Sequence, residues 1–419
     1  MKIWGLAVAL ASVLTLGLVN PAQAAGSINI YSEYAVSQIT INVSTASATS
    51  LASAPKVYVP ATVTISQGLV TLSRLTASMH LKGSSTLKQN PSLTSNRPSI
   101  RVKFDIAALT ARGIQTSYKT LTLNSMYQDS SKIHEYSAYK LFNAMNVPAP
   151  RVGYAKVKVI IGTRTYDKGL YAVIEPYDST FLKAHFTDKT QHLYENCGLF
   201  DDITKAYSTT GGAACLTTAS VYETKIGWSK YPNKRDLAAL KSAQTVSANY
   251  TWWVRMGQLT DRSELIRMWA VENFISSWDS YSGPTVNNYY LRSSTTGVFS
   301  MLPFGTDESF GSQTSFNFSM IAPNIGYPLI KKDFTVSTLK RGSMFVRCVK
   351  YVTCRNEYLD ALKQTSAQAS RIGLISQMRY IGTVISKYAP TAGWAQQNTR
   401  NWVSKKQLDV RALLKLYSR

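Results

Sequence analysis

The N-terminal third of the chain alternates apolar and polar residues in short runs. Residues 57–59 and 62–65 show this period of two inside a segment, 25–80, that is rich in Ser, Thr, Val and Ala. The same alternation returns at 101–104, after a small-residue turn at 82–86. A period of two is typical of half-buried strands. The pattern therefore predicts a β-rich N-terminal region of strands joined by turns.

A helical pattern follows this region. Four apolar residues recur at the i, i+3, i+4, i+7 spacing of one helix face, and these are Ala138, Leu141, Phe142 and Met145. One of residues 129–131, Asp-Ser-Ser, is expected to cap the helix. Pro148 then ends it, because proline removes a backbone donor and clashes with the preceding turn.

Two hairpins are predicted farther along the chain. Residues 154–161 alternate in polarity, and 170–175 return as their partner after a turn that contains glycine. Residues 288–291 and 298–302 form the second pair, around a polar turn.

Helices dominate the predicted C-terminal half. A capping box at Asp261 and Glu264 begins a helix that runs to about residue 278. Residues 176–260 give no clear pattern, and the last third is helical in pattern, ending at 403–416. The fold class predicted is α+β, with a β-rich N-terminal lobe and a mainly helical C-terminal lobe.

Composition and charge narrow the class of protein. The chain has 419 residues, of which 45% are hydrophobic, so it can bury a sizeable core in about two lobes. Its 46 Lys and Arg against 23 Asp and Glu give a formal charge of +23. These charges are dispersed and accompany no nucleic-acid-binding motif, so we expect no nucleic-acid partner. Anionic cell-surface polymers or acidic proteins suit an exported basic protein better.

The N-terminus predicts export. A basic start, an apolar run at 3–19 and Ala22-Gln23-Ala24 form a signal peptide over residues 1–24, with cleavage after Ala24. A membrane anchor is the alternative, but the run is shorter than the ~20 residues that a spanning helix prefers. No later stretch is long and apolar enough to span a bilayer. The mature chain is therefore expected to be secreted, or periplasmic or in the cell envelope.

The cysteines agree with an exported protein. An even count of four favours two local disulfides, Cys197–Cys215 and Cys348–Cys354. Neither pair has a histidine at ligand spacing, which argues against zinc. The four histidines are scattered, so the sequence gives no support to a Ser-His-Asp hydrolase.

Candidate chemistry lies around the second hairpin. Asp279 follows the helix, Asn287 precedes the hairpin with Asn288 as an open alternative, and Asp307 comes after it. Protein kinases use this order of helix, acid, loop, Asn, hairpin and acid. Phosphoryl transfer needs such groups because positioning and charge stabilise its transition state. Asp279 is the candidate base, and Asn287 and Asp307 are the candidate ligands of the metal on ATP.

Several blocks resemble the CotH family of bacterial and fungal secreted or spore-coat kinases, which have an atypical protein-kinase-like fold. The resemblance runs from about residue 81 to 311, with a weaker tail toward 411. The blocks, in the family's order, are Lys82-Gly83-Ser84-Ser85-Thr86, 99–105, 121–131, Glu135, 147–151, Gly169-Leu170-Tyr171 with Glu175, and 278–283 with 287–291. The last block is the most specific.

The resemblance implies an architecture. An N-lobe would cover 81–176 and a C-lobe 177–419, with the nucleotide between them. Residues 25–80 form a β-rich N-terminal segment, and whether it is a separate module stays open.

The resemblance also implies roles for individual residues. Lys103 would bind ATP phosphates and pair with Glu135, with Arg101 as the rival on the same strand face. The backbone of Gly83, Ser84 and Ser85 would approach the phosphates. Glu175 would lie at the hinge near the adenine.

One sequence motif differs from that of the family. The family carries Pro-Trp-Asp-x-Asp, where this chain has Pro303-Phe304-Gly305-Thr306-Asp307. Asp307 keeps the second acid and Gly305 replaces the first. Glu308 is a neighbour, but adjacent strand positions point to opposite sides.

Two functions follow from these observations. The first is a secreted kinase that uses ATP with Mg²⁺ or Mn²⁺ to phosphorylate Ser or Thr of exported or envelope proteins. The second is a catalytically degenerate, kinase-like surface protein, an adhesin or envelope binding component, which Gly305 and the high positive charge motivate.

Overall fold

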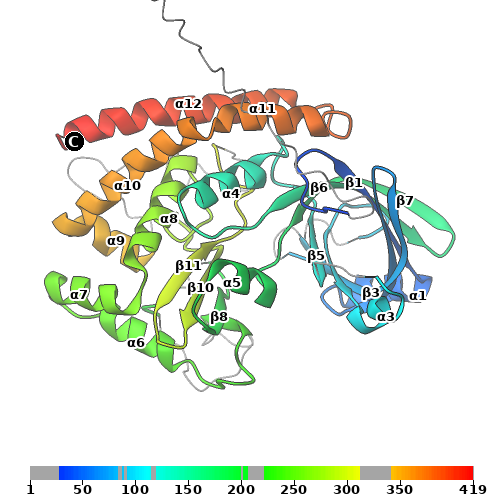
Figure 1. Cartoon of the computed structure of the whole chain (residues 1–419), viewed down its shortest axis with the longest axis horizontal. Coiled ribbons are helices and arrows are strands. Elements are labelled where there is room, and N and C mark those ends of the chain that lie inside the picture. Colours follow the sequence, from blue (N-terminus) through cyan, green and yellow to red (C-terminus); the bar gives the residue numbers. More distant parts are fainter. Residues whose placement is uncertain are drawn as a thin grey trace, which may run out of the picture.

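The strands of the N-terminal region close into a barrel (Figure 1). The computed structural model describes residues 28–83, 87–88, 92–114, 119–199, 202–205, 221–311 and 341–418. The order around the barrel is β1 (Val36–Val43), β2 (Val59–Gln67), β3 (Val70–Lys82), β4 (Ser99–Phe104), β5 (Thr120–Asn124), β7 (Arg164–Ile174) and β6 (Val152–Ile161). Neighbours are antiparallel except β1 and β6, whose parallel pairing closes the ring.

The alternation of apolar and polar residues determines which side chains point into the barrel. Ile39 and Ile41 of β1, Val63 of β2, Val102 of β4 and Leu121 of β5 are all fully buried in one core. Polar residues between them face outward, as expected for a strand whose side chains alternate. The predicted β-rich N-terminal region is confirmed.

The structure answers one question that the sequence left open in this region and corrects one expectation. The boundary drawn at residue 80 falls inside β3, and β1 and β2 belong to the same closed sheet as β4–β7, so 25–80 is part of the barrel. In addition, Thr45–Ser53 forms helix α1 where only strands and turns were expected. Ser44 caps it by accepting a hydrogen bond from the amide of Ser47, and Leu51 anchors it in the barrel core.

Helix α4 (His134–Ala144) lies between the barrel and the C-terminal region. None of residues 129–131 is the N-cap as expected, because Ile133 is the residue before the helix, and it gives no side-chain cap. Asp129 instead accepts from the amide of His134 at 2.9 Å and from the hydroxyl of Ser131 at 2.6 Å. The first turn of α4 is thereby fixed from outside the helix.

A smaller sheet and a set of helices make up the C-terminal region (Figure 1). The antiparallel sheet has the order β11 (Phe299–Pro303), β10 (Tyr289–Ser294), β8 (Thr190–Asn196) and β9 (Tyr222–Ile226). The helices are α5 (Ser179–His185), α6 (Arg235–Gln244), α7 (Asn249–Leu259), α8 (Arg262–Ile275), α9 (Ser343–Lys350), α10 (Val352–Arg371), α11 (Leu374–Ile385) and α12 (Gly393–Leu416). A short helix, α3 (Ile106–Ala111), belongs to the barrel end.

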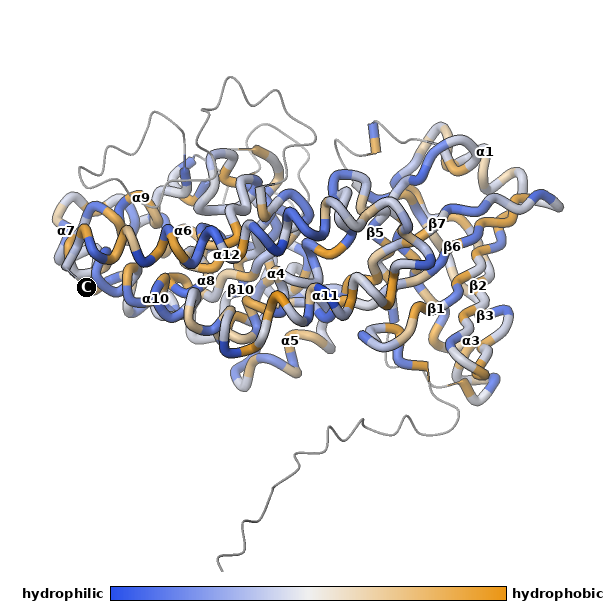
Figure 2. The backbone as a smooth tube through the Cα atoms, turned by 90° about the horizontal axis from the view of Figure 1, so that it is seen from above, coloured by the Kyte–Doolittle hydropathy of each residue, from blue (hydrophilic) through white to orange (hydrophobic). Residues whose placement is uncertain are grey.

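The predicted α+β arrangement is confirmed. The barrel and the helical region each have a hydrophobic core, and α4 belongs to the core of the helical region. Figure 2 shows the strands of the barrel, with α1 and α3, at one end and the larger C-terminal helices α6–α10 and α12 at the other. Both predicted hairpins form, as β6–β7 and β10–β11.

The described residues include one of the two predicted disulfides. A disulfide joins Cys348 of α9 to Cys354 of α10, as predicted. Cys215 lies outside the described residues, so its pairing with Cys197 stays a prediction. Among the described residues no helix is long and apolar enough to cross a membrane. The expected signal peptide, 1–24, lies outside the described residues.

Only one of the two hydrogen bonds of the predicted capping box is seen at the start of α8. Asp261 accepts from the amide of Glu264 at 2.9 Å, but the Glu264 carboxyl turns to β11 and accepts from the amide of Met301 at 3.2 Å. Glu264 is therefore a buried link between helix and sheet. Burial raises its pKa to about 8, and the charge of Asp261 adds to the effect.

This raised pKa predicts a loss of stability at alkaline pH. Glu264 stabilises the fold fully below its unfolded pKa of 4.5, and the stabilisation is lost as pH rises through about 8. Between pH 6 and pH 9 the loss is on the order of 3 kcal/mol. Glu264→Gln should remove that part of the pH dependence of urea unfolding. Glu357→Gln, at a half-exposed position of α10, is the control and should leave the profile unchanged.

Candidate active site

Asp279 stands at the centre of a network of amide side chains. Its carboxylate accepts from Nδ2 of Asn287 at 3.1 and 3.2 Å and from Nδ2 of Asn288 at 2.8 Å. Asn196 of β8 donates in turn to Oδ1 of Asn287 at 2.8 Å. Both asparagines that the sequence left open therefore contact the acid. Burial raises the pKa of Asp279, and these hydrogen bonds oppose the rise.

The loop that carries Asp279 is held by the end of α8. Glu272 accepts from the amide of Ser282 at 3.0 Å and from its hydroxyl at 2.6 Å. Gly283 is needed for this tight path, because a Cβ there would lie 2.2 Å from the carbonyl oxygen of Trp278. Burial raises the pKa of Glu272 to about 7, and the bonds from Ser282 oppose this.

Asp307 follows β11 and lies in the field of the other acids. Burial raises its pKa to about 6, and the charges of Asp129 and Asp279 raise it further, while Lys82 lowers it. Glu135 of α4 has a pKa well above its usual range, because it is buried and close to Asp307 and Asp129. Acids from α4, from the Asp279 loop and from the segment after β11 thus share one environment.

Lys82, and not Lys103, is the lysine of this cluster. Burial lowers the pKa of Lys82, and the negative charges of Glu195, Glu135 and Asp307 oppose that fall only in part. Its ammonium also lies 4.8 Å from the centre of the Phe304 ring. Lys103 is exposed.

The strand register separates Lys103 from Glu135, with which it was predicted to pair. Lys82 pairs with Ser99, at the end of β4 where Ser99 contacts Asn124, and Asn124 donates to Glu135 at 2.7 Å. Lys103 pairs with Thr120 at the opposite end of β4, about 13 Å along the strand. Its pairing with Glu135 is therefore not formed. Arg101, the rival, lies between them and lowers the pKa of Lys82.

The side chain of Asn288 packs closely against Gly305. It has φ +55°, and a Cβ on it would lie 2.8 Å from Nδ2 of Asn288. That amide also lies 3.4 Å from the carbonyl oxygen of Gly305. Asn288 therefore occupies the space next to Asp279 into which a side chain at 305 would project.

The other predicted site residues have mixed placements. Gly83 follows Lys82 with φ +121°, a conformation that suits glycine, while Ser84 and Ser85 lie outside the described residues. Glu175 follows β7 on the link between the barrel and α5, and its carboxylate pairs with Arg151 at 2.7 Å.

The comparison with protein families fits this geometry. The model for the CotH kinase protein matches residues 79–414. The chain belongs to the CotH kinase family. No curated protein matches it. The matched region begins inside β3, so β1 and β2 complete the barrel from outside the stretch that the family model covers.

Several residues of this candidate site were not predicted from the sequence. Asn124, Asn196 and Glu195 were not singled out, and Lys82 was placed only in the turn block. The signal for Lys82 was present, since it directly precedes a glycine that ends a long alternating run. Asn196 and Glu195 fall in the stretch that gave no clear pattern, so only the pairing of β8 with β10 brings them to the site.

The site fits a hard divalent cation only with help from a substrate. In the described ranges, no three His, Cys, Asp or Glu side chains gather closely enough to hold a metal ion. Asp279 and Asp307 are two carboxylates in one field, with amide side chains beside them. Mg²⁺ is typically held by one or two carboxylates plus substrate phosphates. The residues present match a site in which one or two carboxylates and the substrate phosphates hold the metal together.

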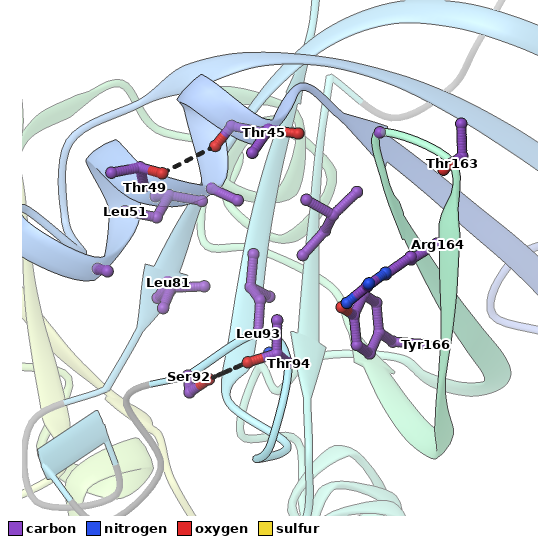
Figure 3. Close-up of a pocket in the computed structure, with 14 residues that line it drawn as sticks. Thr45, Thr49, Leu51, Leu81, Ser92, Leu93, Thr94, Thr163, Arg164 and Tyr166 are labelled. Carbon is purple, nitrogen blue, oxygen red and sulfur yellow. Dashed lines mark hydrogen bonds between the residues drawn. The ribbon is translucent and has the colours of Figure 1, made fainter.

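A separate cavity of about 830 Å³ opens at one end of the barrel (Figure 3). It lies between α1, the turn from β6 to β7 and residues 92–94. Leu51, Leu81 and Leu93 give it apolar walls, and Thr45, Arg164 and other polar residues line its remainder. None of the clustered acids lines it, so this cavity and the candidate active site are distinct.

The contact between Gly305 and Asn288 predicts a specific cost of substitution. Gly305→Ala should destabilise the fold by about 1 kcal/mol for the left-handed backbone, plus about 1–3 kcal/mol for overpacking against Asn288. Gly68→Ala is the matched control, because Gly68 has φ +58° and nothing within 4 Å of its virtual Cβ. Urea unfolding of both variants gives the comparison. Equal losses would mean that Asn288 moves away freely.

Proposed function

We propose that this protein is an ATP-dependent kinase that transfers the γ-phosphoryl group to Ser or Thr of exported or envelope proteins. The observation that carries the proposal is the meeting of Asp279, with its two asparagines, and Asp307, whose charge acts on that of Lys82. These are the types of residue that protein kinases use to position and neutralise a transferring phosphoryl group.

Asp279 is proposed to act as the base. The acceptor hydroxyl oxygen forms a bond to the γ-phosphorus as the bond to the bridging oxygen breaks, and ADP leaves. The hydroxyl proton passes to the Asp279 carboxylate. Burial supports this role, because it raises the pKa of Asp279 and so makes the carboxylate a better proton acceptor. The amides of Asn287 and Asn288 keep the carboxylate oriented.

Lys82 and Asp307 are proposed to hold the phosphates. Lys82 is the cation beside Glu135, and Asp307 with an amide oxygen of Asn287 or Asn288 would hold Mg²⁺ or Mn²⁺. The metal, when bound with ATP, neutralises charge that develops on the phosphoryl oxygens. The raised pKa values of Asp307 and Glu135 support a cationic ligand, because burial and, to a smaller extent, the repulsion between the acids disfavour their charged forms until a cation is bound.

The net charge and the expected export of the protein suggest its partners. The signal peptide expected at 1–24 supports a substrate among exported or envelope proteins. With a formal charge of +23, the protein is expected to be attracted to acidic proteins and anionic cell-surface polymers.

The alternative is a degenerate, kinase-like surface protein that acts as an adhesin or an envelope binding component. Gly305 favours it, because the family's first acid is absent and Asn288 fills the adjacent space. Such a protein would bind its partner with or without Asp307.

The first test is transfer of label from ATP. The purified protein with Mg²⁺ or Mn²⁺ should label itself or a generic acceptor, and Asp279→Asn and Asp307→Asn should each lower the rate at least about 100-fold. Asp409→Asn is the control, because Asp409 forms a surface ion pair with Lys405 on α12. No label and no metal-dependent ATP binding in the unmodified protein would support the degenerate alternative.

Lysine substitutions test the assignment of the phosphate ligand. Lys82→Met should weaken binding of a fluorescent ATP analogue about ten- to hundredfold, since a charged hydrogen bond is lost. Lys103→Met should bind as the unmodified protein does, because Lys103 is exposed at the other end of β4. The reverse result would contradict the assignment of Lys82.

A further inference from the structure

Helix α12 presents polar side chains to the interior. Gln396 and Thr399 are buried on the same face as Val403, yet an amide and a hydroxyl are costly to bury unless they are hydrogen-bonded. Gln396 donates to the carbonyl oxygen of Ser131 at 3.1 Å. Gln396 therefore makes a specific hydrogen bond, which an apolar residue packed at the same position could not make.

Thr399 reaches the active-site segment through His134. Its hydroxyl lies 3.0 Å from Nε2 of His134 and 2.9 Å from the carbonyl oxygen of Ala395. Nδ1 of the same ring lies 2.7 Å from the backbone carbonyl oxygen of Asp307, so this nitrogen carries a proton and donates it. The ring is buried, so one imidazole joins α12, the first turn of α4 and Asp307.

The residues after Asp307 are also held from two sides. The amide of Phe310 donates to the carbonyl oxygen of Ile275, at the end of α8, at 2.6 Å. Gly311 packs against Trp402 of α12, where a Cβ would lie 2.7 Å from the indole ring. The Phe310 ring lies 5.4 Å from the His134 ring. Segment 307–311 therefore lies between α8 and α12.

We propose that the α12 face formed by Gln396 and Thr399 is a positioning element for the active site. It holds Glu135 through the first turn of α4, and it holds Asp307 through His134. Helix α12 packs against α8 and reaches the first residue of α4 through Thr399 and His134, so one C-terminal helix contacts both supports of the site. Its effect on phosphoryl transfer rests on the proposed function, whereas the coupling to Asp307 does not.

Hydrogen exchange measured by mass spectrometry tests the coupling without any assay of activity. Thr399→Val keeps the side-chain volume and removes the hydroxyl, and it should speed exchange at least about threefold in peptides from 303–311 and 129–137. Thr399→Ser keeps the hydroxyl and should restore protection. Thr383→Val is the matched control, because Thr383 also donates to the carbonyl four residues earlier but is exposed on α11.

The outcomes separate the two proposals. Unchanged exchange in Thr399→Val, or an equal change in Thr383→Val, would overturn the positioning role. Faster exchange in a protein that never transfers phosphate would uphold the positioning role and count against the proposed kinase. If Thr399→Val does not fold, Gln396→Met should raise exchange in 129–137 through the lost bond to Ser131, and unchanged exchange there would also overturn the role.

Activity gives a second readout if the protein is a kinase. Thr399→Val should raise the metal concentration for half-maximal rate about tenfold and leave the KM of the acceptor unchanged, because Asp307 is the displaced group. Thr399→Ser should rescue the metal dependence. A rise in the acceptor KM with normal metal dependence would contradict the assignment.

Discussion

The burial of like charges around Lys82 is the constraint on which the rest of the site depends. Asp129, Glu135, Asp279 and Asp307 act on one another's pKa or on that of Lys82. Carboxylates so close together are unfavourable in a medium of low dielectric constant unless cations and hydrogen bonds compensate. The barrel supplies Lys82 and Asn124, and the C-terminal region supplies the amides of Asn287 and Asn288. Neither half contains the whole set.

Helix α8 sets the relation between the two principal acids. Asp279 lies in the loop that leaves this helix, and Glu272 of the helix fixes that loop through Ser282. The segment after Asp307 is anchored at the same end of the helix, through Phe310 and Ile275. At the other end, Glu264 ties α8 to β11, the strand that leads to Asp307. One helix therefore supports both acids at its C-terminal end and the strand between them at its start.

Local features of the site could be predicted from the sequence, and features that depend on strand register could not. Asp279, its asparagines and the hairpin follow one another in the chain, so their order was enough. The choice between Lys82 and Lys103 depends on how β3, β4 and β5 align. Periodicity tells which residues share a face but not which end of the face meets α4. The α+β class followed from alternation and helical spacing. Helix α1 was not predicted, because its residues are mostly Ser, Thr and Ala and the strand pattern around it masked any helical signal.

The parallel pairing of β1 with β6 has a consequence for how this chain reaches its native state. Val36 aligns with Tyr154, so one edge of the first strand has no partner until most of the barrel sequence has been synthesised. Until then β1 exposes an unpaired edge, which is prone to pair with other chains. Such distant pairing slows folding, because loop closure must precede the contact. Closure of the barrel should therefore be a late event in folding, and the interval before it is when aggregation is most probable.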